Sequence, residues 1–435
     1  MRRRRAVAVA MTVALAALVA ACSEPEEDAT ATTGGDEARA AACDGLDLLA
    51  CARLSTIADL VPDEPVVASG EPVVLGMVNQ ENTPVGSFPE LSASVQAAVT
   101  FVNENLGGVG GRPVEVEVCN TDFSAEGSTA CGQRFAEAGV AAVLGGIDVF
   151  GNAVDVLADN AIPFVGGIPV STQSVTAPNS YQWSGGTWGA AVAFAEWATT
   201  ELGAESVSIV YGEFGSIADA AADGQTVLEA RGVQTQLVPY PIVATDLTSP
   251  LTAAVASEPD AVVVLAADTG CKAAYDAVRV VGIDVPVFYT GACASPNIVA
   301  SVPPEATEGA FYNVEGPVST TNPSPDFALY DAVLAAYSDG LDPVGAPTVT
   351  FRSFMNLYVQ LAGLATIDAT EVADALSAQR DTASFMGHPY TCDGEQFEGL
   401  RAMCSPQQII VQMRSQEVTQ VSDWIDVGRI YADSL

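Results

Sequence analysis

Few side chains in this sequence are suited to catalysis. His388 is the single histidine among 435 residues, so a Ser-His-Asp or Cys-His arrangement has one candidate base. No serine lies in a Gly-x-Ser-x-Gly elbow, and no Gly-x-x-x-x-Gly-Lys-Ser/Thr loop is present to hold phosphates. The glycine-rich residues 107–112 are expected to follow a helix and precede a strand, the reverse of a dinucleotide loop, and we interpret them as a helix end and turn. We therefore expect no enzyme and no cofactor.

The cysteines point to disulfides. Eight of the nine follow residue 42, and an even number is typical of disulfide-bonded proteins outside the cytoplasm. Many pairings are possible, and the sequential one is the simplest because each pair closes a short loop within one structural unit. The alternative is a metal site built from His388, Cys392 and Cys404, which lacks a convincing fourth ligand, so we expect no metal. The sequential pairs are Cys43–Cys51, Cys119–Cys131, Cys271–Cys293 and Cys392–Cys404.

The remaining cysteine, Cys22, lies where the chain changes character. Arg2 to Arg5 precede an apolar run, residues 6–21, which has the length of a signal-peptide core and is marginal for a membrane span of about 20 residues. Val19-Ala20-Ala21-Cys22 resembles the lipobox of bacterial lipoprotein signals, in which the cysteine is lipidated and the chain is cut before it. The alternative is an ordinary cleaved signal with an incidental cysteine. We predict a signal peptide over residues 1–21 and lipidation of Cys22.

Residues 22–42 are acidic and nearly free of large apolar side chains, so we expect a disordered tether there.

Composition excludes nucleic acid as a partner. The whole chain has a formal net charge of −38, and Lys272 is its single lysine. Nucleic-acid binding depends largely on cationic contacts with phosphates, which this chain cannot supply. The excess of acid is interpreted as a solvated surface.

The chain from residue 72 alternates short apolar strands with helices. Leu91, Val95, Ala98 and Val102 recur on one face of a helix expected over residues 90–105. This β-α-β-α order predicts a parallel sheet covered by helices, and the pattern begins again after residue 189, which predicts a second α/β unit. Strands are expected at residues 73–78, 114–119, 140–144, 163–165, 207–211, 234–238, 261–266, 287–290 and 408–413. Helices are expected at residues 128–138, 152–160, 189–202, 216–231, 247–257, 269–281, 324–338, 347–365 and 370–379.

These segments resemble a known family. AAVTFVNENLGGVGGRPVEVEVCNTDFS, VAAVLGGIDVFGNAV, NAIPFVGG, SVSIVYGEFG and PDAVVVLAADTG occur in this order, and they are similar to successive segments of the periplasmic solute-binding proteins of the branched-chain amino acid type (type I, leucine-binding-protein-like), which serve ABC importers. The similarity covers the chain from about Val73 onward. Cys119 and Cys131 bracket a position where members of this family often have a disulfide.

The resemblance implies an α/β fold with two Rossmann-like lobes, joined by three crossovers around a central ligand cleft. After the disulfide-tied segment 43–71, we assign residues 72–186 plus 315–387 to the first lobe and residues 187–314 plus 388–435 to the second. Ligands of parallel sheets bind beyond the carboxyl ends of the strands. The candidate binding residues at these ends are Phe88, Asp148, Val149, Phe150, Ile168, Pro169, Phe214, Asp268, Thr269 and Ala292.

The departures from the family predict an unusual ligand. Amino-acid-binding members have Ser and Thr at the third and fourth strand ends to hold the ligand carboxylate, where this chain has Asp148 to Phe150 and Ile168 to Val170. They have an acid near Ala292 for the ammonium group. A carboxylate without donors is costly to desolvate, so we expect a cationic or amide-bearing ligand held partly by aromatic faces. The alternative roles are core packing for each Phe and helix capping for each Asp.

We expect a receptor on the outer face of the cytoplasmic membrane, in the periplasm or cell envelope. It would be monomeric, anchored to the membrane by its lipid, and would close by a hinge on an amino acid, amide or related small molecule and deliver it to an ABC permease and its ATPase. A sensor of the same fold without transport is the alternative, and an enzyme on this scaffold is a more distant one.

Overall fold

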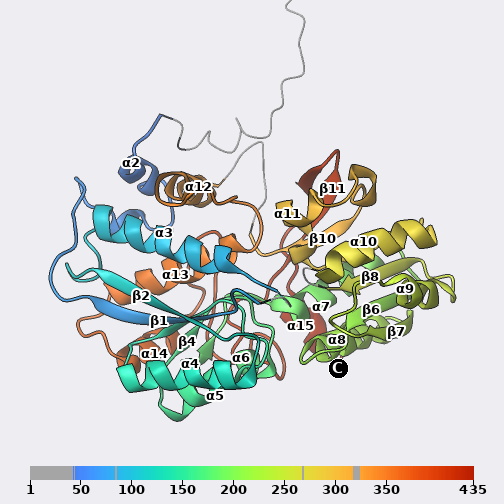
Figure 1. Cartoon of the computed structure of the whole chain (residues 1–435), viewed down its shortest axis with the longest axis horizontal. Coiled ribbons are helices and arrows are strands. Elements are labelled where there is room, and N and C mark those ends of the chain that lie inside the picture. The colour runs from blue at the N-terminus through green and yellow to red at the C-terminus, as the bar shows by residue number, and fades with distance from the viewer. Residues whose placement is uncertain (1–42, 44, 84–85, 267–268, 317–323) are drawn as a thin grey trace, which may run out of the picture.

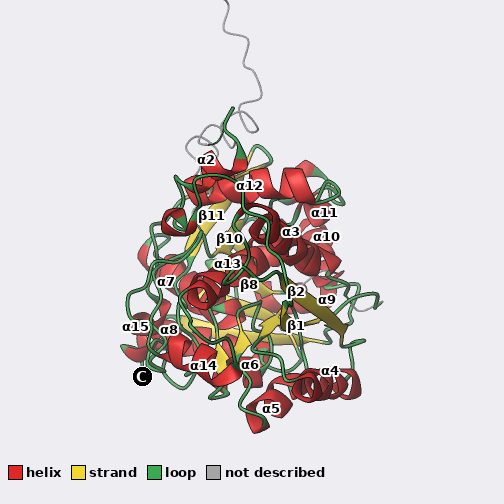
Figure 2. Cartoon of the chain, turned by 90° about the vertical axis from the view of Figure 1, so that its left-hand side faces the viewer, coloured by secondary structure: helices red, strands yellow, loops and turns green. Residues whose placement is uncertain are grey.

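Two α/β lobes form the protein in a computed structural model, which describes residues 43, 45–83, 86–266, 269–316 and 324–435. The lobes lie side by side, each with a sheet between layers of helices (Figures 1 and 2). Within the described ranges, no helix combines the length and apolar character needed to cross a membrane. The expectations for residues 1–21 and 22–42, including lipidation of Cys22, fall outside the described residues.

The first lobe is built on a parallel sheet. Five strands of the described chain lie in the order β2-β1-β3-β4-β5. The register pairs Val73 with Val114 and Asn79 with Asn120, so β1 and β2 end at the same edge. These strands are rich in valine, which packs well on a pleated surface. Their bounds are β1 Val73–Asn79, β2 Val114–Asn120, β3 Val143–Gly145, β4 Phe164–Val165 and β5 Ser180–Tyr181.

Helices cover both faces of this sheet. The predicted apolar face of α3 is buried at Leu91, Val95, Ala98 and Val102, and α3 packs beside α13 in one core. Phe135 of α4 lies in the core of the opposite face with residues of α5. The helices of this lobe are α3 Pro89–Asn105, α4 Ala125–Ala138, α5 Asn152–Asp159, α6 Thr172–Thr176, α12 Pro325–Tyr337, α13 Pro347–Ala362 and α14 Ala369–Ser377.

The second lobe has a mixed sheet. Seven strands lie in the order β12-β11-β10-β9-β8-β6-β7 within the described ranges, and β11 pairs antiparallel with both neighbours. The central strand β8 is buried throughout because α7 and α8 cover one face and α9 and α10 the other. Its strands are β6 Ser206–Gly212, β7 Gln234–Tyr240, β8 Ala261–Leu265, β9 Val287–Tyr289, β10 Phe311–Val314, β11 Ile409–Arg414 and β12 Glu417–Gln420. Its helices are α7 Gly186–Thr200, α8 Ile217–Ala230, α9 Thr248–Val255, α10 Thr269–Val281, η2 Gly291–Ala294, α11 Pro296–Val299, η3 Pro304–Ala306 and α15 Val427–Ala432.

The chain passes between the lobes three times. The first crossover, residues 182–185, follows β5; the second begins after β10 and is described at residues 315–316; the third, residues 391–408, leads into β11. The first and third run side by side, because Gln182 N donates to Ala402 O and Cys404 N donates to Gln182 O, both over 2.8 Å. Cys404 packs in the core of the first lobe, whereas Met403 packs in the core of the second. We retain the lobe boundaries given above as a proposal.

All four predicted disulfides are confirmed: Cys43–Cys51, Cys119–Cys131, Cys271–Cys293 and Cys392–Cys404. The alternative metal site at His388 is thereby wrong, since Cys392 and Cys404 bond to each other. His388 instead lies beside Trp424, with 5.3 Å between the ring centroids. Among the described residues, no group of three or more His, Cys, Asp or Glu side chains is placed to hold a metal ion.

The segment before the first sheet packs on the first lobe. It contains the short helix α2, Leu48–Ala52, and the 3₁₀ turn η1, Ala58–Leu60. α2 contacts α12, and both views place it at the outer side of that helix (Figures 1 and 2). The buried carboxylate of Asp326 on α12 accepts from Thr56 N over 2.6 Å and from Met386 N over 2.9 Å. One acid of α12 thus joins this segment to the lobe.

Candidate functional site

Loops at the carboxyl ends of both sheets meet between the lobes. Phe123 follows β2 and Phe150 follows β3 in the first lobe, and Phe214 follows β6 in the second. Phe214 lies 5.9 Å from Phe123 and 5.8 Å from Phe150 between ring centroids, and Phe123 lies 5.5 Å from Phe150. These distances are typical of interacting aromatic pairs. We call Phe123, Phe150 and Phe214 the aromatic cluster.

The backbone around the aromatic cluster is held by local bonds. Phe123 has a φ of 50°, a left-handed conformation that non-glycine residues seldom adopt, and the Cys119–Cys131 disulfide joins the end of β2 to α4 just beside it. Gly151 follows Phe150 with a φ of 72°, and a Cβ there would lie 2.7 Å from Ser171 Oγ. Only glycine therefore fits where the chain turns from Phe150 into α5.

A second contact joins the lobes next to the aromatic cluster. The hydroxyl of Ser216, at the start of α8, donates to the carbonyl of Val170 after β4. In the same loop, Ile168 is half-buried against the first core and Pro169 is buried. The loops after β4 and β6 therefore touch directly, and the described structure has its lobes together at this point.

Asp148 lies beneath the aromatic cluster and is engaged within its own lobe. It is 6% exposed. Its carboxylate accepts from Ser128 Oγ over 2.6 Å and from Phe150 N over 3.3 Å, and Ser128 Oγ in turn accepts from Ala153 N. Burial raises the pKa of the Asp148 carboxyl, while these hydrogen bonds partly offset the rise. Asp148 thus fixes the loop that carries Phe150. Its hydrogen-bond partners within the described residues include no cation.

The other predicted residues are spread around the same edge. Phe88 precedes α3 and packs half-buried against the first core, and it is not part of the aromatic cluster. Val149 packs against that core as well. Ala292 is exposed within η2, which the Cys271–Cys293 disulfide joins to α10. Thr269 begins α10, and Asp268 lies outside the described residues.

Two buried oxygens at this edge have no hydrogen-bond partner within the described structure. They are Gln80 Oε1, after β1, and Thr121 Oγ1, after β2. A buried acceptor without a donor costs free energy, but both side chains are enclosed, at 2% and 0% exposed, so a bound molecule would reach them only if the surrounding loops moved. None of the loops that follow β1, β2, β3, β4, β6 and β9 contains lysine or arginine. This edge therefore offers aromatic faces and no lysine or arginine from these loops.

The opposite side of the interlobe region, at the crossovers, is polar. Arg352 of α13 pairs with Glu315 of the second crossover over 2.8 Å between Nη2 and Oε2. The two side chains are 4% and 10% exposed. Sequence analysis missed this pair because the partners are separated along the chain; the available signal was a lone arginine within the apolar run of α13. Sequence analysis also missed Phe123, whose acidic loop gives no periodic pattern.

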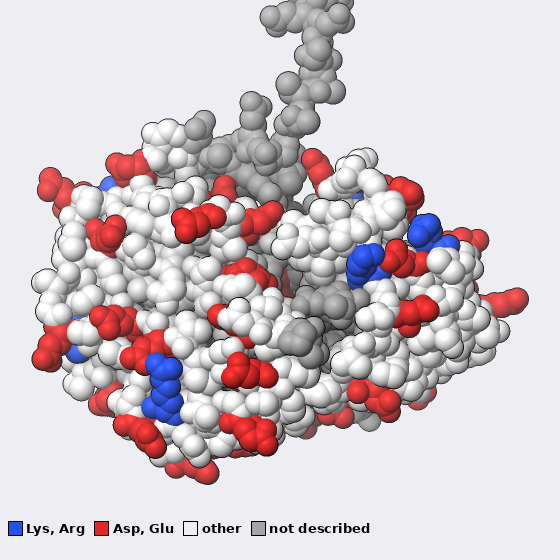
Figure 3. Space-filling model, in the orientation of Figure 1, with Lys and Arg blue, Asp and Glu red and all other residues white. Residues whose placement is uncertain are grey.

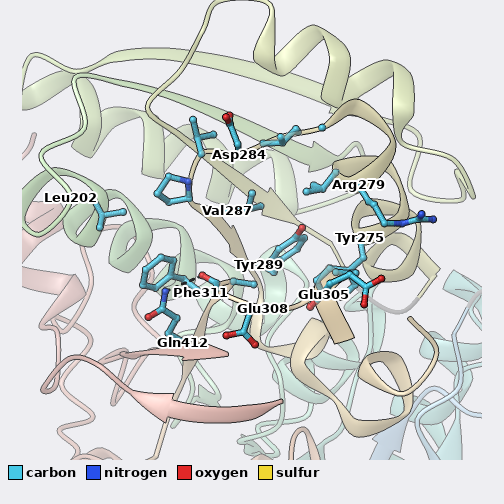
Figure 4. Close-up of a pocket in the computed structure, with 18 residues that line it drawn as sticks. Leu202, Tyr275, Arg279, Asp284, Val287, Tyr289, Glu305, Glu308, Phe311 and Gln412 are labelled. Carbon is cyan, nitrogen blue, oxygen red and sulfur yellow. Dashed lines mark hydrogen bonds between the residues drawn. The ribbon is translucent and has the colours of Figure 1, made fainter. Parts of the chain in front are cut away.

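A groove on the second lobe lies away from this edge. It has a volume of about 700 Å³ and lies at the amino ends of β9 and β10, where Val287 and Phe311 line it (Figure 4). None of the predicted site residues lines it. Ligands of parallel sheets bind at the carboxyl ends, so we place the candidate site at the aromatic cluster. The space-filling view shows a hollow between the lobes, with acidic side chains spread widely over this face and few basic ones (Figure 3).

Comparison with known proteins gives a consistent result. Residues 72–403 match the family model described as periplasmic binding protein. A search of curated protein sequences gives no significant match. Eight solved structures with a similar fold cover 80–86% of this chain and 96–100% of their own chains, at 13–19% sequence identity.

Three of these structures illustrate the similarity. The isoleucine complex of a branched-chain amino acid transporter substrate-binding protein from Streptococcus pneumoniae has 15% identity and a TM-score of 0.67, covering 81% of this chain and 100% of its own. A fatty acid ABC transporter substrate-binding protein from Thermomonospora curvata has 17% identity and a TM-score of 0.70, covering 86% and 96%. A solute-binding protein of an ABC transporter from R. palustris, in complex with 4-hydroxybenzoate, has 18% identity and a TM-score of 0.66, covering 82% and 96%.

Proposed function

The chain belongs to the periplasmic binding protein family, and from this premise we propose that it is a lipid-anchored receptor outside the cytoplasm that closes on a small molecule and delivers it to an ABC importer. The observation that carries the proposal is the aromatic cluster, in which residues from both lobes meet at the carboxyl ends of their strands. Hinge closure around a bound molecule brings such loops together. The ligand shifts the open–closed equilibrium by its greater affinity for the closed form.

The ligand is a small amide-bearing or cationic molecule with an apolar part. Solved relatives carry isoleucine or 4-hydroxybenzoate, both of which have a carboxylate. In this chain the strand ends offer Val149 and Ile168 where a carboxylate would need donors, and Arg352 is already paired with Glu315. The aromatic cluster supplies faces for an apolar or cationic group, and Gln80 Oε1 and Thr121 Oγ1 would add acceptors for N–H donors if separation of the lobes uncovered them.

The receptor acts as a monomer on the outer face of the cytoplasmic membrane. Cys22 and the acidic residues 22–42 support this through the lipobox-like sequence and the composition of a tether. The partners are the permease and its ATPase, which supply the energy for transport. The ligand leaves chemically unchanged.

A thermal-shift screen of amino acids, amides, polyamines and aromatic acids tests the proposal. A ligand at about 100 times its Kd adds about 2.7 kcal/mol, which shifts the Tm of a protein this size by about 3 °C. Phe214→Ala serves as the matched variant, in which the shift should shrink. Mass spectrometry of the recovered ligand should show no conversion.

Tight binding of isoleucine or 4-hydroxybenzoate, without any shift by amides or cations, would overturn the ligand class. Conversion of a bound compound would overturn the receptor itself. Binding without transport, in vesicles containing the cognate permease, would favour a sensor.

A further inference from the structure

We propose that Glu315 and Arg352 are positioning residues of the ligand site, acting through a chain of hydrogen bonds that ends on the ligand-facing loop of the second lobe. The proposal rests on the proposed function only for the assignment of that loop to the ligand site, and its test needs no ligand. It assigns a role to a buried ion pair that lies at the crossovers and not at the aromatic cluster.

The Glu315 carboxylate gathers the crossovers at one point. Oε1 accepts from Ser184 Oγ over 2.7 Å and from Gly185 N over 3.0 Å in the first crossover. It also accepts from Gln408 Nε2 over 3.1 Å at the end of the third. Glu315 itself belongs to the second crossover, so its side chain connects all three crossovers. Arg352 holds Glu315 through two further hydrogen bonds. Its Nη2 donates to the carboxylate oxygen Oε2, and its Nη1 donates to the backbone carbonyl of Glu315.

From Glu315 the bonds continue into the second lobe. Gln408 Oε1 accepts from Asn313 Nδ2 over 2.8 Å, and Asn313 Oδ1 accepts from Gly291 N over 2.8 Å. Gly291 begins η2, directly after β9, and precedes Ala292 at the predicted ligand edge. Gln408 and Asn313 are both buried, so these amides cannot readily exchange their partners for water. The orientation of each amide is fixed by its two neighbours.

The other end of the chain reaches the first lobe. Arg352 lies on α13 beside Ser353, whose hydroxyl accepts from Gly167 N over 3.1 Å. Gly167 lies two residues after β4 and precedes Ile168 at the ligand edge. α13 therefore holds a backbone amide of the loop after β4 in the first lobe and, through Arg352 and Glu315, a backbone amide of η2 in the second. We infer that this continuous set of contacts couples the two halves of the site to the geometry of the crossovers.

A paired substitution separates positioning from stability. Replacing a buried ion pair by apolar residues of similar volume often leaves the fold stable, but Ser184, Gly185 and Gln408 also lose Glu315 as their acceptor, so Glu315→Leu with Arg352→Met should fold with a lowered Tm. The double variant removes one of the two acceptors of Gln408 Nε2 and leaves the other, the Pro406 carbonyl, so Gln408 and, through it, Asn313 should be held less firmly. Amide hydrogen exchange of ligand-free protein, resolved to Gly291 by fragmentation mass spectrometry, should show at least a tenfold loss of protection there.

Matched variants define the expected range. Asn313→Ala removes the last link without disturbing a charge and should lower Gly291 protection at least as much. Glu117→Gln with Arg134→Gln removes an ion pair of the same 2.7–2.8 Å length that is about half exposed on the first lobe, and it should leave Gly291 unchanged. If the Glu315→Leu/Arg352→Met protein fails to fold, amide exchange is measured on Glu315→Gln instead, and a smaller loss of protection at Gly291 is expected.

Unchanged protection at Gly291 in the double variant overturns the proposal. An equal loss of protection along β8 and β9 overturns it too, because that pattern means general destabilisation. A loss confined to Gly291 and its neighbours supports it, whether or not the ligand screen succeeds.

Discussion

The two sides of the interlobe region are held by different kinds of contact. At the crossovers, Arg352, Glu315 and Gln408 form directed bonds between buried polar groups. At the strand ends, Phe150 of one lobe meets Phe214 of the other by ring contact. Charged hydrogen bonds demand a defined geometry, whereas apolar contact is non-directional.

This difference matches what each side must do when the lobes separate. In the proposed hinge motion the crossovers form the axis, so they have to keep one geometry throughout. The aromatic cluster has to part and re-form, and rings can do so without leaving a buried charge unpaired. Polar bonds therefore suit the hinge, and aromatic contacts suit the moving edge.

Breaking the Arg352–Glu315 pair at the crossovers should cause the largest loss in free energy of unfolding. Arg352→Met leaves the Glu315 carboxylate buried without its cation, and breaking a buried pair in this way costs about 3–5 kcal/mol. Urea unfolding followed by circular dichroism measures the loss in free energy of unfolding. A loss below about 1 kcal/mol, the value usual for exposed pairs, would mean that the two sides do not differ in the way described.

Breaking the aromatic side should change the equilibrium between closed and open forms more than the stability of either lobe. Phe214→Ala removes two ring contacts, each worth about 0.5–1.5 kcal/mol beyond the area buried. Small-angle scattering of the ligand-free variant should show a larger radius of gyration than that of the wild type. Phe214→Leu, which keeps an apolar side chain, should lie between them; equal radii for all three would contradict the role of the rings.

The hydroxyl of Ser216 is a polar exception on the aromatic side, and removing it sharpens the comparison. Ser216→Ala loses the bond to the Val170 carbonyl, worth about 0.5–1.5 kcal/mol. The same scattering measurement should show a smaller expansion than Phe214→Ala. An expansion as large as that of Phe214→Ala would place the main contact between the lobes at Ser216.

Asp148 is the buried acid of the aromatic side; both acids bond to a serine and to backbone N–H, but Glu315 is also paired with a cation, Arg352. Its pKa is raised from 3.8 by burial, so the folded form binds this proton more tightly than the unfolded form. Its contribution to stability is complete below pH 3.8 and is lost as the pH rises through the raised pKa. Denaturation of wild type and Asp148→Asn from pH 3 to 7 should show the stability of the wild type, relative to the variant, falling over that window. Asp159→Asn, at an exposed position of α5, should show no such trend.

Much of the fold could be predicted from local pattern. The periodicity of Leu91, Val95 and Val102 predicts α3 and its buried face, and the valine-rich runs predict β1, β2 and β8. Sequential pairing of cysteines predicts the disulfides because each loop is short. The strands β5, β10 and β12 were not predicted, since Ser180–Tyr181 is too short for a pattern and the other two are defined by pairing with distant strands.

The candidate site was less accessible to sequence reasoning. Phe150 and Phe214 could be named because they directly follow strands, and the structure brings them together. Phe123 enters the cluster only because β2 lies beside β1 and its chain turns through a left-handed conformation. The partners Glu315 and Arg352 depend on how the second crossover passes α13, a tertiary relation without a local signal. Phe88 stays apart from the cluster.

The attachment of Thr56 to Asp326 has a mechanical consequence. The chain before the first sheet is joined to α12 by that carboxylate and closed on itself by the Cys43–Cys51 disulfide. A pull on the N-terminal end of the described chain would be transmitted to the first lobe and would bypass the crossovers. In the proposed hinge motion, a restraint on that end would hold the first lobe and leave the second lobe as the part that moves.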